Sequence, residues 1–270
     1  MQQSDTLAIV LPAYKPDFLR QALDSLAAQT SHDFMAYVCD DCSPHDLEPI
    51  VRQYEGRLPM RYIRFEQNMG GRDLVAHWER CIGQIQGETW LWIFSDDDVM
   101  GSHCVELFHE ARQQHPEQDL FHFDTQVIDA QGRPTTDPHY IKEDFPTRLS
   151  AEDFLRGRLG YRYNSFIVEY VVRRSAFDRA GGFVHYDLAW CSDDATWARM
   201  AESTGMLTIS GDKVSWRKSD VNITPKRNLS IGWRKLRATW HYLEFCRRRV
   251  PGSFRLRTNY LLHAIYNFIR

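Results

Sequence analysis

The chain has 270 residues, of which 43% are hydrophobic and 26% are charged, so it is long enough for one or two domains with a sizeable core. This is the composition of an ordinary globular protein. No run approaches the ~18 apolar residues of a membrane-spanning helix. The first residues lack the basic segment of a secretory signal, so we expect neither feature.

The net charge of -3 is unevenly distributed along the chain. Residues 226–270 contain eleven Lys and Arg and one Glu, a net charge of +10, and the remaining residues carry -13. Such an asymmetry suggests an acidic catalytic body and a tail suited to a negatively charged surface. An acidic body would repel nucleic acid, so we expect no nucleic-acid partner.

The six cysteines are scattered through the chain, which is typical of reduced thiols in the cytoplasm. Cys39 and Cys42 form a Cys-x-x-Cys sequence, but no second pair lies at the spacing of a zinc site. Because the two cysteines enclose two aspartates at the end of an apolar run, a redox motif, which would open a helix, is not favoured.

The first half of the chain alternates apolar runs with segments of helical spacing. We predict strands at 7–14, 34–41, 60–65 and 89–94, and helices at 16–29, 44–55 and 72–85. Alternating strands and helices predict an α/β fold, with a Rossmann-like, mostly parallel sheet flanked by helices on both faces. Apolar strands of this kind are buried on both faces.

The second half is less regular. We predict strands at 119–129 and 166–174, a helix that begins with capping-box spacing at 150–153, and a helix at 193–202. Short strands are expected near 206–210 and 213–217, and two helices near 228–248 and 253–269. We therefore divide the chain into a catalytic domain, residues 1–225, and a basic, aromatic helical tail, residues 226–270.

Three groups of aspartates mark a candidate site. Asp40 with Asp41, and Asp96 with Asp97 and Asp98, follow predicted strands, and the carboxyl ends of parallel strands form the ligand-binding edge of such sheets. Three adjacent carboxylates repel one another unless a cation lies among them. Oxygen ligands favour Mg²⁺ or Mn²⁺, so a metal site is predicted at 96–98.

Each group also has a purely structural interpretation. Aspartate is a preferred residue at the first position of a helix or turn, and Asp40 with Asp41 precedes the turn at Pro44. The third group, Asp193 and Asp194, opens a predicted helix, where acidic residues complement the helix dipole. For both of these groups the structural and functional interpretations remain open.

Five segments in order resemble the signature of the family 2 glycosyltransferases. They are an apolar strand ending Pro12-Ala13-Tyr14, a strand ending Asp40-Asp41-Cys42-Ser43, the segment Asn68-Met69-Gly70-Gly71-Arg72, the run Ser95-Asp96-Asp97-Asp98, and Gly181-Gly182-Phe183 followed by Asp193-Asp194. The resemblance covers roughly residues 7–225. It implies the GT-A fold and an inverting transfer from a nucleoside-diphosphate sugar, most often a uridine one.

The resemblance also implies roles for individual residues. Asp41, with Asp40, would bind the base or ribose, and Asp96, Asp97 and Asp98 would hold the metal that bridges the diphosphate. Pro12, Tyr14, Asn68, Asp96 and Asp97 would line the nucleotide-sugar site. Arg72 would contact phosphate or form a surface salt bridge. Asp194 is the expected general base, with Asp193 second.

This sequence departs from the family pattern at several positions. Cys42 replaces a glycine, which argues against a positive φ there, and Ser95 replaces the first acid of the metal motif. The late strand lacks the family's histidine, so Arg217 or Lys218 is expected to supply positive charge to the diphosphate. The Gln-x-x-Arg-Trp motif of processive synthases is missing, which favours transfer of a single sugar.

The acceptor expected from the resemblance is a saccharide or a lipid-linked saccharide, as in bacterial surface-polysaccharide assembly, including lipopolysaccharide and O-antigen. The tail would then bind an anionic membrane on the inner face of the cell, or it would simply pack on the body with a solvated basic face. Two alternative functions stand beside this one. The first is a sugar-phosphate nucleotidylyltransferase, which should have a Gly-rich loop after the first strand, and the second is a non-catalytic nucleotide-sugar binding protein.

Overall fold

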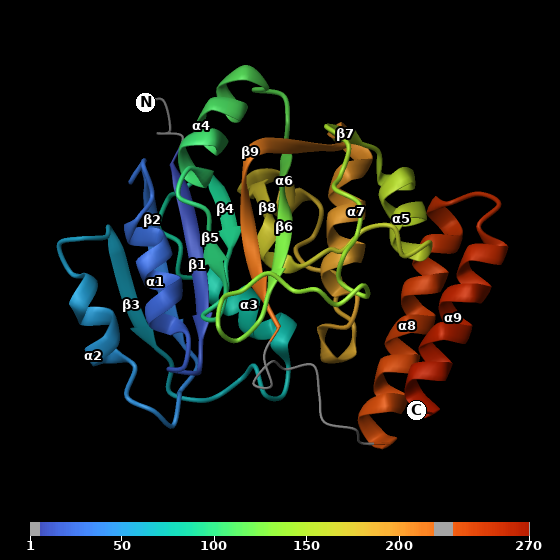
Figure 1. Cartoon of the computed structure of the whole chain (residues 1–270), viewed down its shortest axis with the longest axis horizontal. Helices are drawn as coiled ribbons and strands as arrows, with labels where there is room; N and C mark the ends of the chain where they lie inside the picture. The colour runs from blue at the N-terminus through green and yellow to red at the C-terminus, as the bar shows by residue number, and fades with distance from the viewer. Residues whose placement is uncertain (1–5, 219–228, 270) are drawn as a thin grey trace.

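The computed structural model describes residues 6–218 and 229–269 (Figure 1). The predicted boundary between body and tail at 225/226 lies outside these residues, as do Lys226 and Arg227 of the tail. In the described ranges the chain folds around one sheet with helices on both faces, and the two last helices form a hairpin at one side.

The N-terminal half of the sheet is parallel, as predicted. Its strands are β1 (Leu7–Ala13), β2 (Phe34–Asp40), β3 (Met60–Arg64) and β4 (Trp90–Ile93), in the order β3-β2-β1-β4. All three pairings among them are parallel. Their carboxyl ends therefore meet at one edge of the sheet, the edge at which the aspartates follow β2 and β4.

The second half of the sheet mixes directions. It contains β8 (Tyr170–Arg173), β6 (Leu120–Ile128), β9 (Met206–Arg217), β5 (Val99–Met100) and β7 (Arg148–Leu149). β8 runs antiparallel between β4 and β6, whereas β6 and β9 are parallel. The two short strands expected near 206–210 and 213–217 are one strand, β9, which continues through a register shift opposite Phe123 and Thr125. The expected α/β fold class is confirmed.

Each face of the sheet has its own hydrophobic core, because successive residues of a strand point to opposite faces. Leu7, Ile9 and Leu11 of β1 face one core, and Ala8 and Val10 face the other. The first core is covered by α1 (Leu19–Ala27), α2 (Glu48–Val51) and α4 (Cys104–Gln114), and the second by α3 (Leu74–Ile82), α5 (Ala151–Leu159), α6 (Arg174–Arg179) and α7 (Ser192–Thr204).

Several helix boundaries differ from the predictions. The helix expected at 44–55 is only α2 and a 3-10 turn, Arg52–Tyr54, because Ser43 and the residues after it form a hydrogen-bonded turn instead. The helix expected at 72–85 begins at Leu74, since Asp73 caps it by accepting from the Ala76 amide. The capping box at Ser150 does start a helix, α5. Neither α4 nor α6 was predicted.

The tail is the expected pair of helices, α8 (Leu229–Arg249) and α9 (Phe254–Ile269). Tyr242, Cys246 and Tyr260 on their inner face belong to the second core, and Arg249 pairs with Glu202 of α7. Part of the tail's positive charge is thus used to dock it on the body. None of the described helices has the length and hydropathy needed to cross a membrane.

Gly157 in α5 allows a close approach that a larger residue would prevent. A Cβ at this position would lie 2.2 Å from two ring carbons of Tyr163. We predict that Gly157→Ala lowers the free energy of unfolding by about 1–3 kcal/mol through overpacking. Chemical denaturation measures this loss.

Gly83→Ala at the end of α3 is the matched control. Gly83 has a helical φ of -60°, and a Cβ added there would lie no closer than 3.3 Å to its nearest neighbour, the Arg80 carbonyl oxygen. Its free energy of unfolding should change by no more than about 1 kcal/mol. Equal losses for the two substitutions would contradict the role given to Tyr163.

Candidate active site

The ends of β1, β2 and β4 are joined directly at the sheet edge. Ala13 lies beside Asp40 in the register of β1 and β2, and the Asp41 amide donates to the Ala13 carbonyl at 2.9 Å. On the other side of β1, the Phe94 amide donates to the Val10 carbonyl at 2.8 Å. The two aspartate groups that follow β2 and β4 therefore flank the Pro12–Tyr14 end of β1, as the sequence predicts.

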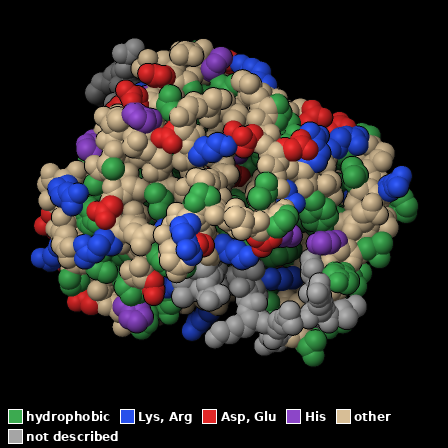
Figure 2. Space-filling model, viewed as in Figure 1, with side chains coloured by type: hydrophobic (Ala, Val, Ile, Leu, Met, Phe, Trp, Pro, Cys, Tyr) green, Lys and Arg blue, Asp and Glu red, His purple; other side chains and the backbone are tan. Residues whose placement is uncertain are grey.

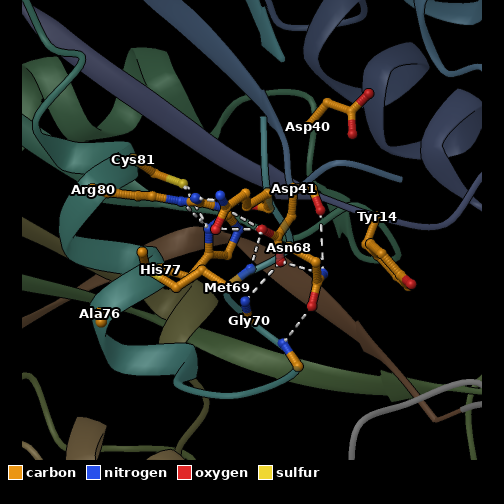
Figure 3. Close-up of polar contacts among 12 residues, drawn as sticks. Tyr14, Asp40, Asp41, Asn68, Met69, Gly70, Ala76, His77, Arg80 and Cys81 are labelled. Atoms are coloured by element: carbon orange, nitrogen blue, oxygen red, sulfur yellow. Dashed lines mark hydrogen bonds and ion pairs between the residues drawn. The ribbon is translucent and has the colours of Figure 1, made fainter. Parts of the chain in front are cut away.

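Asp41 is buried and holds the loop of residues 68–70 (Figure 3). One carboxylate oxygen accepts from the Met69 amide at 2.8 Å, and the other accepts from the Gly70 amide at 2.7 Å and from Asn68 Nδ2 at 2.8 Å. A buried carboxylate needs such donors to offset the loss of hydration. The loop that the sequence assigned to the nucleotide is thus fixed to the end of β2.

Arg80 and His77 of α3 complete the surroundings of Asp41. Arg80 forms a close ion pair with the carboxylate, and its Nε donates to His77 Nδ1 at 3.1 Å. Burial lowers the pKa of His77 to about 4, assisted by the Arg80 charge and against the opposing charge of Asp41. The imidazole is therefore neutral and acts as a hydrogen-bond acceptor.

Asp40 points away from this cluster (Figure 3) and is fully buried. Its oxygens accept from the Ser43 amide at 2.7 Å and from Tyr62 and Arg64 of β3, each at 2.5 Å. This turn gives Cys42 a φ of +53°. Our expectation of a negative φ at Cys42 was wrong, because the Asp40 and Ser43 hydrogen bonds hold the turn in a conformation that costs a non-glycine residue about 1–2 kcal/mol.

Two of the three aspartates after β4 are used by backbone amides. Asp96 Oδ2 accepts from the Tyr14 and Lys15 amides at 2.7 and 3.0 Å, and Asp98 Oδ1 accepts from the Arg217 amide at 2.7 Å. Burial and the neighbouring Asp97 charge raise the pKa of Asp96 to about 6 and raise that of Asp98 well above its usual range. A cation among these groups would relieve this repulsion.

Asp97 is the member of the run with the most available carboxylate. It is half-buried, and the hydrogen bond that its side chain accepts comes from the Ser95 hydroxyl. Within the described ranges, no three His, Cys, Asp or Glu side chains come together as a metal cage. One or two carboxylates are enough for Mg²⁺ or Mn²⁺ when phosphate oxygens and water fill the other positions, so Asp97, with the second oxygen of Asp96, fits this kind of site.

Arg217 does not lie where we predicted. Its side chain is fully buried, and its guanidinium donates to the carbonyls of Asp97 and Asp129, at 2.7 and 3.0 Å, and to Gln21 at 2.7 Å. The guanidinium is therefore not available to a diphosphate, and it fixes the loop that carries Asp97. Lys218 is also engaged, since its Nζ lies 3.0 Å from Asp137.

The remaining nucleotide-site candidates lie around this edge. Pro12 is half-buried in β1, Tyr14 is exposed, and Asn68 is half-buried beside Asp41. Arg72 is exposed, and no salt bridge or side-chain hydrogen bond involves it in the part of the chain that the structure describes. Arg72 was expected to contact phosphate or to form a surface salt bridge, and the salt bridge is not observed among the described residues.

Asp193 and Asp194 lie in the first turn of α7. Within residues 6–218 and 229–269, no hydrogen bond or ion pair joins them to Asp96, Asp97 or Asp98. Asp194 is buried, and its Oδ2 accepts from Arg158 Nε of α5 at 2.9 Å, while its Oδ1 has no partner among the described residues. Burial and the Asp194 charge raise the pKa of Asp193 to about 7.

The segment before α7 reaches back to the start of α3. His185 Nε2 lies 2.9 Å from Asp73, the residue that follows Arg72 and caps α3. Arg158, which the sequence did not indicate, also donates to the Tyr163 carbonyl at 2.7 Å. Nothing local in the sequence pairs residues 158 and 194, because the contact depends on how α5 packs against α7.

A groove of about 340 Å³ lies between β6 and residues 134–145. Its polar lining includes Asp124, Gln126 and Asn164, with the buried pair His122 and Glu169, whose closest atoms are 3.7 Å apart. Burial raises the pKa of Glu169. Asn164 follows Tyr163, whose carbonyl accepts from Arg158, so this part of the groove lining is one residue away in sequence from a contact of Arg158.

The neutral state of His77 predicts a pH dependence of stability. Its pKa is lowered by folding, so as the pH falls below about 6.5 the unfolded chain takes up a proton that the folded chain does not. Stability contributed by neutral His77 is complete above that pH and is lost below it. Wild type should therefore lose more unfolding free energy between about pH 7 and pH 5 than His77→Gln. Parallel denaturation curves for the two proteins would contradict this account.

Residues 8–166, more than half of the chain, match the sequence profile of Glycosyl transferase family 2. An uncharacterized glycosyltransferase of Haemophilus influenzae is 32% identical over 108 residues, which are 39% of this chain and 39% of that protein. The hyaluronan synthase of Pasteurella multocida is 41% identical over 64 residues, 23% of this chain and 7% of that protein. The matches thus span well under half the length of these relatives.

The fold is also found among solved structures. Residues 1–349 of S. aureus TarS, in complex with UDP-GlcNAc, superpose with a TM-score of 0.66 at 16% identity, covering 98% of this chain and 80% of that one. Such a likeness shows a shared fold, which is the GT-A fold expected from the sequence motifs. The profile match covers more than half of the chain, so the chain belongs to glycosyl transferase family 2.

Proposed function

We propose that this enzyme transfers one sugar from a nucleoside-diphosphate sugar to a hydroxyl of a saccharide or lipid-linked saccharide, with inversion at the transferred carbon. The observation that carries the proposal is the sheet edge, where the Asp41-bound loop and the available Asp97 carboxylate flank the end of β1. The complex of the similarly folded TarS with UDP-GlcNAc supports a uridine donor.

In this proposal the nucleotide lies along the end of β1. Tyr14 and Asn68 would contact the base or ribose, and Arg72 would contact phosphate, because its guanidinium is exposed next to the fixed loop. Asp40 and Asp41 would act mainly by holding the turn and the loop in place, since protein donors already occupy their oxygens.

The same edge suits a divalent metal, Mn²⁺ or Mg²⁺. Asp97 and the second oxygen of Asp96 would hold it, and Asp98 would support them by fixing β9 through the Arg217 amide. When bound, such an ion neutralises charge that develops on the leaving diphosphate. Buried Arg217 would keep the Asp97 loop in position without touching the donor.

For the proton transfer we propose Asp194 as the base, with Asp193 as the second candidate. Asp194 Oδ1 is a buried acceptor without a donor in the described ranges, and an acceptor hydroxyl would satisfy it. Arg158 holds the other oxygen, so the carboxylate is fixed in one orientation. The polar groove between β6 and residues 134–145, whose lining residue Asn164 follows the Arg158 contact Tyr163, would receive the acceptor saccharide.

The division into a body, residues 1–225, and a tail, residues 226–270, also remains a proposal. The tail docks through Tyr242 and Tyr260, yet it exposes Trp240 and Phe254 to solvent. Figure 2 shows basic and hydrophobic side chains side by side along the right edge, where α8 and α9 lie. Both packing on the body and contact with an anionic membrane on its cytoplasmic side thus have support.

Removing the Asp97 charge tests the donor site. Asp97→Asn should weaken Mn²⁺-dependent UDP binding by about tenfold or more, because the ion would lose its best carboxylate ligand. Isothermal titration with UDP, in Mn²⁺ and in chelator, measures this effect. Asp178→Asn, at an exposed position of α6, removes the same charge and should bind UDP like wild type. If Asp97→Asn binds UDP as tightly as wild type, and the affinity of both proteins is the same in Mn²⁺ and in chelator, the metal site is refuted.

Asparagine variants at the start of α7 test the base. Asp194→Asn should slow transfer by about 10²–10⁴-fold and leave UDP affinity nearly unchanged, since a base acts on the acceptor. Turnover is followed as UDP release from a panel of UDP-sugars and saccharide acceptors. If Asp193→Asn lowers the transfer rate more than Asp194→Asn does, Asp193 is the base. Full activity in both variants would show that neither aspartate of α7 is the base.

A further inference from the structure

A second cavity, of about 370 Å³, lies between the tail and the segment that precedes α7. It is lined by His185, Tyr186, Asp187, Arg237, Ala238 and His241. The first three flank or belong to the 3-10 turn Asp187–Ala189, and the last three lie on α8. Neither the strand edge nor the groove beside β6 shares a residue with this cavity.

The cavity presents positive and protonatable groups. Arg237 is exposed, and in the described part of the chain its guanidinium takes part in no salt bridge or hydrogen bond. The charge of Asp187 is balanced by Arg234, whose Nε and terminal nitrogen lie 2.9 and 2.6 Å from its two oxygens. His185 is oriented by Asp73, and the His241 ring stacks on Tyr186. Together these groups fit a phosphate, which accepts paired hydrogen bonds from arginine.

The cavity adjoins the candidate catalytic helix. The Tyr186 amide donates to the Ser192 hydroxyl at 3.0 Å, two residues before Asp194, and Trp190 Nε1 donates to Thr239 of α8 at 3.1 Å. One wall of the cavity is thus the turn that leads into α7. A group bound there would lie close to an acceptor hydroxyl presented to Asp194.

The exposed face of α8 indicates which kind of molecule would carry a phosphate into this cavity. Trp233 and Trp240 lie four residues before and three residues after Arg237, so all three share one face of the helix. Both rings are mostly exposed, with 66% and 55% of their surface accessible. Exposed tryptophans beside basic residues are typical of a helix that lies in a membrane interface.

We propose that this cavity binds the phosphate or diphosphate of a lipid-linked acceptor, with Arg237 as its main ligand and His185 and His241 as additional donors. The inference rests on the proposed function, because it names the chemistry of the acceptor. Phosphate binding here would hold the acceptor's saccharide next to α7, while the lipid remains at the face of Trp233 and Trp240.

The test uses the full-length protein and inorganic pyrophosphate at constant ionic strength, with a chelator present so that the metal-dependent donor site stays empty. Binding is followed by NMR through the ring resonances of His185 and His241. In wild type these resonances should shift as pyrophosphate is added and reach a plateau. Arg237→Gln should weaken this binding by about tenfold, the loss expected for one charge-assisted contact.

Arg248→Gln is the matched control, because Arg248 is exposed on the same helix but does not line the cavity. It should bind pyrophosphate like wild type. Equal losses in the two variants would mean nonspecific attraction to the basic helix, and no loss in Arg237→Gln would refute the site. His241→Gln, also at an exposed position, should lower the pyrophosphate affinity by less than Arg237→Gln does. It tests the same cavity independently if Arg237→Gln fails to fold.

Vesicles distinguish a lipid from a soluble phosphate. Phosphatidylcholine vesicles that carry a polyprenyl diphosphate should retain wild type better than vesicles with the corresponding polyprenol, and free pyrophosphate should release it. Equal retention on both vesicles would overturn the lipid source even if pyrophosphate binds. UDP binding in Mn²⁺ should be unchanged in Arg237→Gln, so a failure of this site is separable from a failure of the donor site.

Discussion

A buried carboxylate must find hydrogen-bond donors, and at the carboxyl edge of this sheet many of these donors are backbone amides of neighbouring loops. Asp41 collects the amides of Met69 and Gly70, and Asp96 collects those of Tyr14 and Lys15. The acids that end β2 and β4 therefore fix the loops around a ligand site. Asp97 differs from them because, among residues 6–218 and 229–269, the Ser95 hydroxyl is the donor to its side chain, which leaves it suited to a metal.

The same requirement organises the acceptor side. Asp194 would be an uncompensated buried charge without Arg158, and that pair is enclosed by Tyr242 and Tyr260 of the tail. Loss of one partner from such a pair is costly, by about 3–5 kcal/mol. The tail thus contributes to the core around α7 as well as to the outer surface. One face of the tail packs on the body and the other exposes Trp240. Its composition therefore supports both packing on the body and contact with a membrane.

The sequence predicted the strands of the parallel half and the position of the aspartates, because both depend on local pattern and on the geometry of parallel sheets. It could not predict the direction of Arg217, which depends on the pairing of β6 with β9 far along the chain. The Arg158–Asp194 contact likewise depends on helix packing. At Cys42 the residue type suggested a negative φ, but the hydrogen bond from the Ser43 amide to Asp40 and that from the Ser43 hydroxyl to the Tyr14 carbonyl hold the turn at a positive φ.

The central claim is that the edge formed by β1, β2 and β4 binds a nucleoside diphosphate through a metal on Asp97. Crystals soaked with UDP and Mn²⁺, with data collected at the manganese absorption edge, test it most directly. The account predicts an anomalous peak about 2–2.5 Å from a carboxylate oxygen of Asp97, with uracil beside the Asn68–Gly70 loop. Uracil density elsewhere, or a peak away from the run after β4, would contradict it.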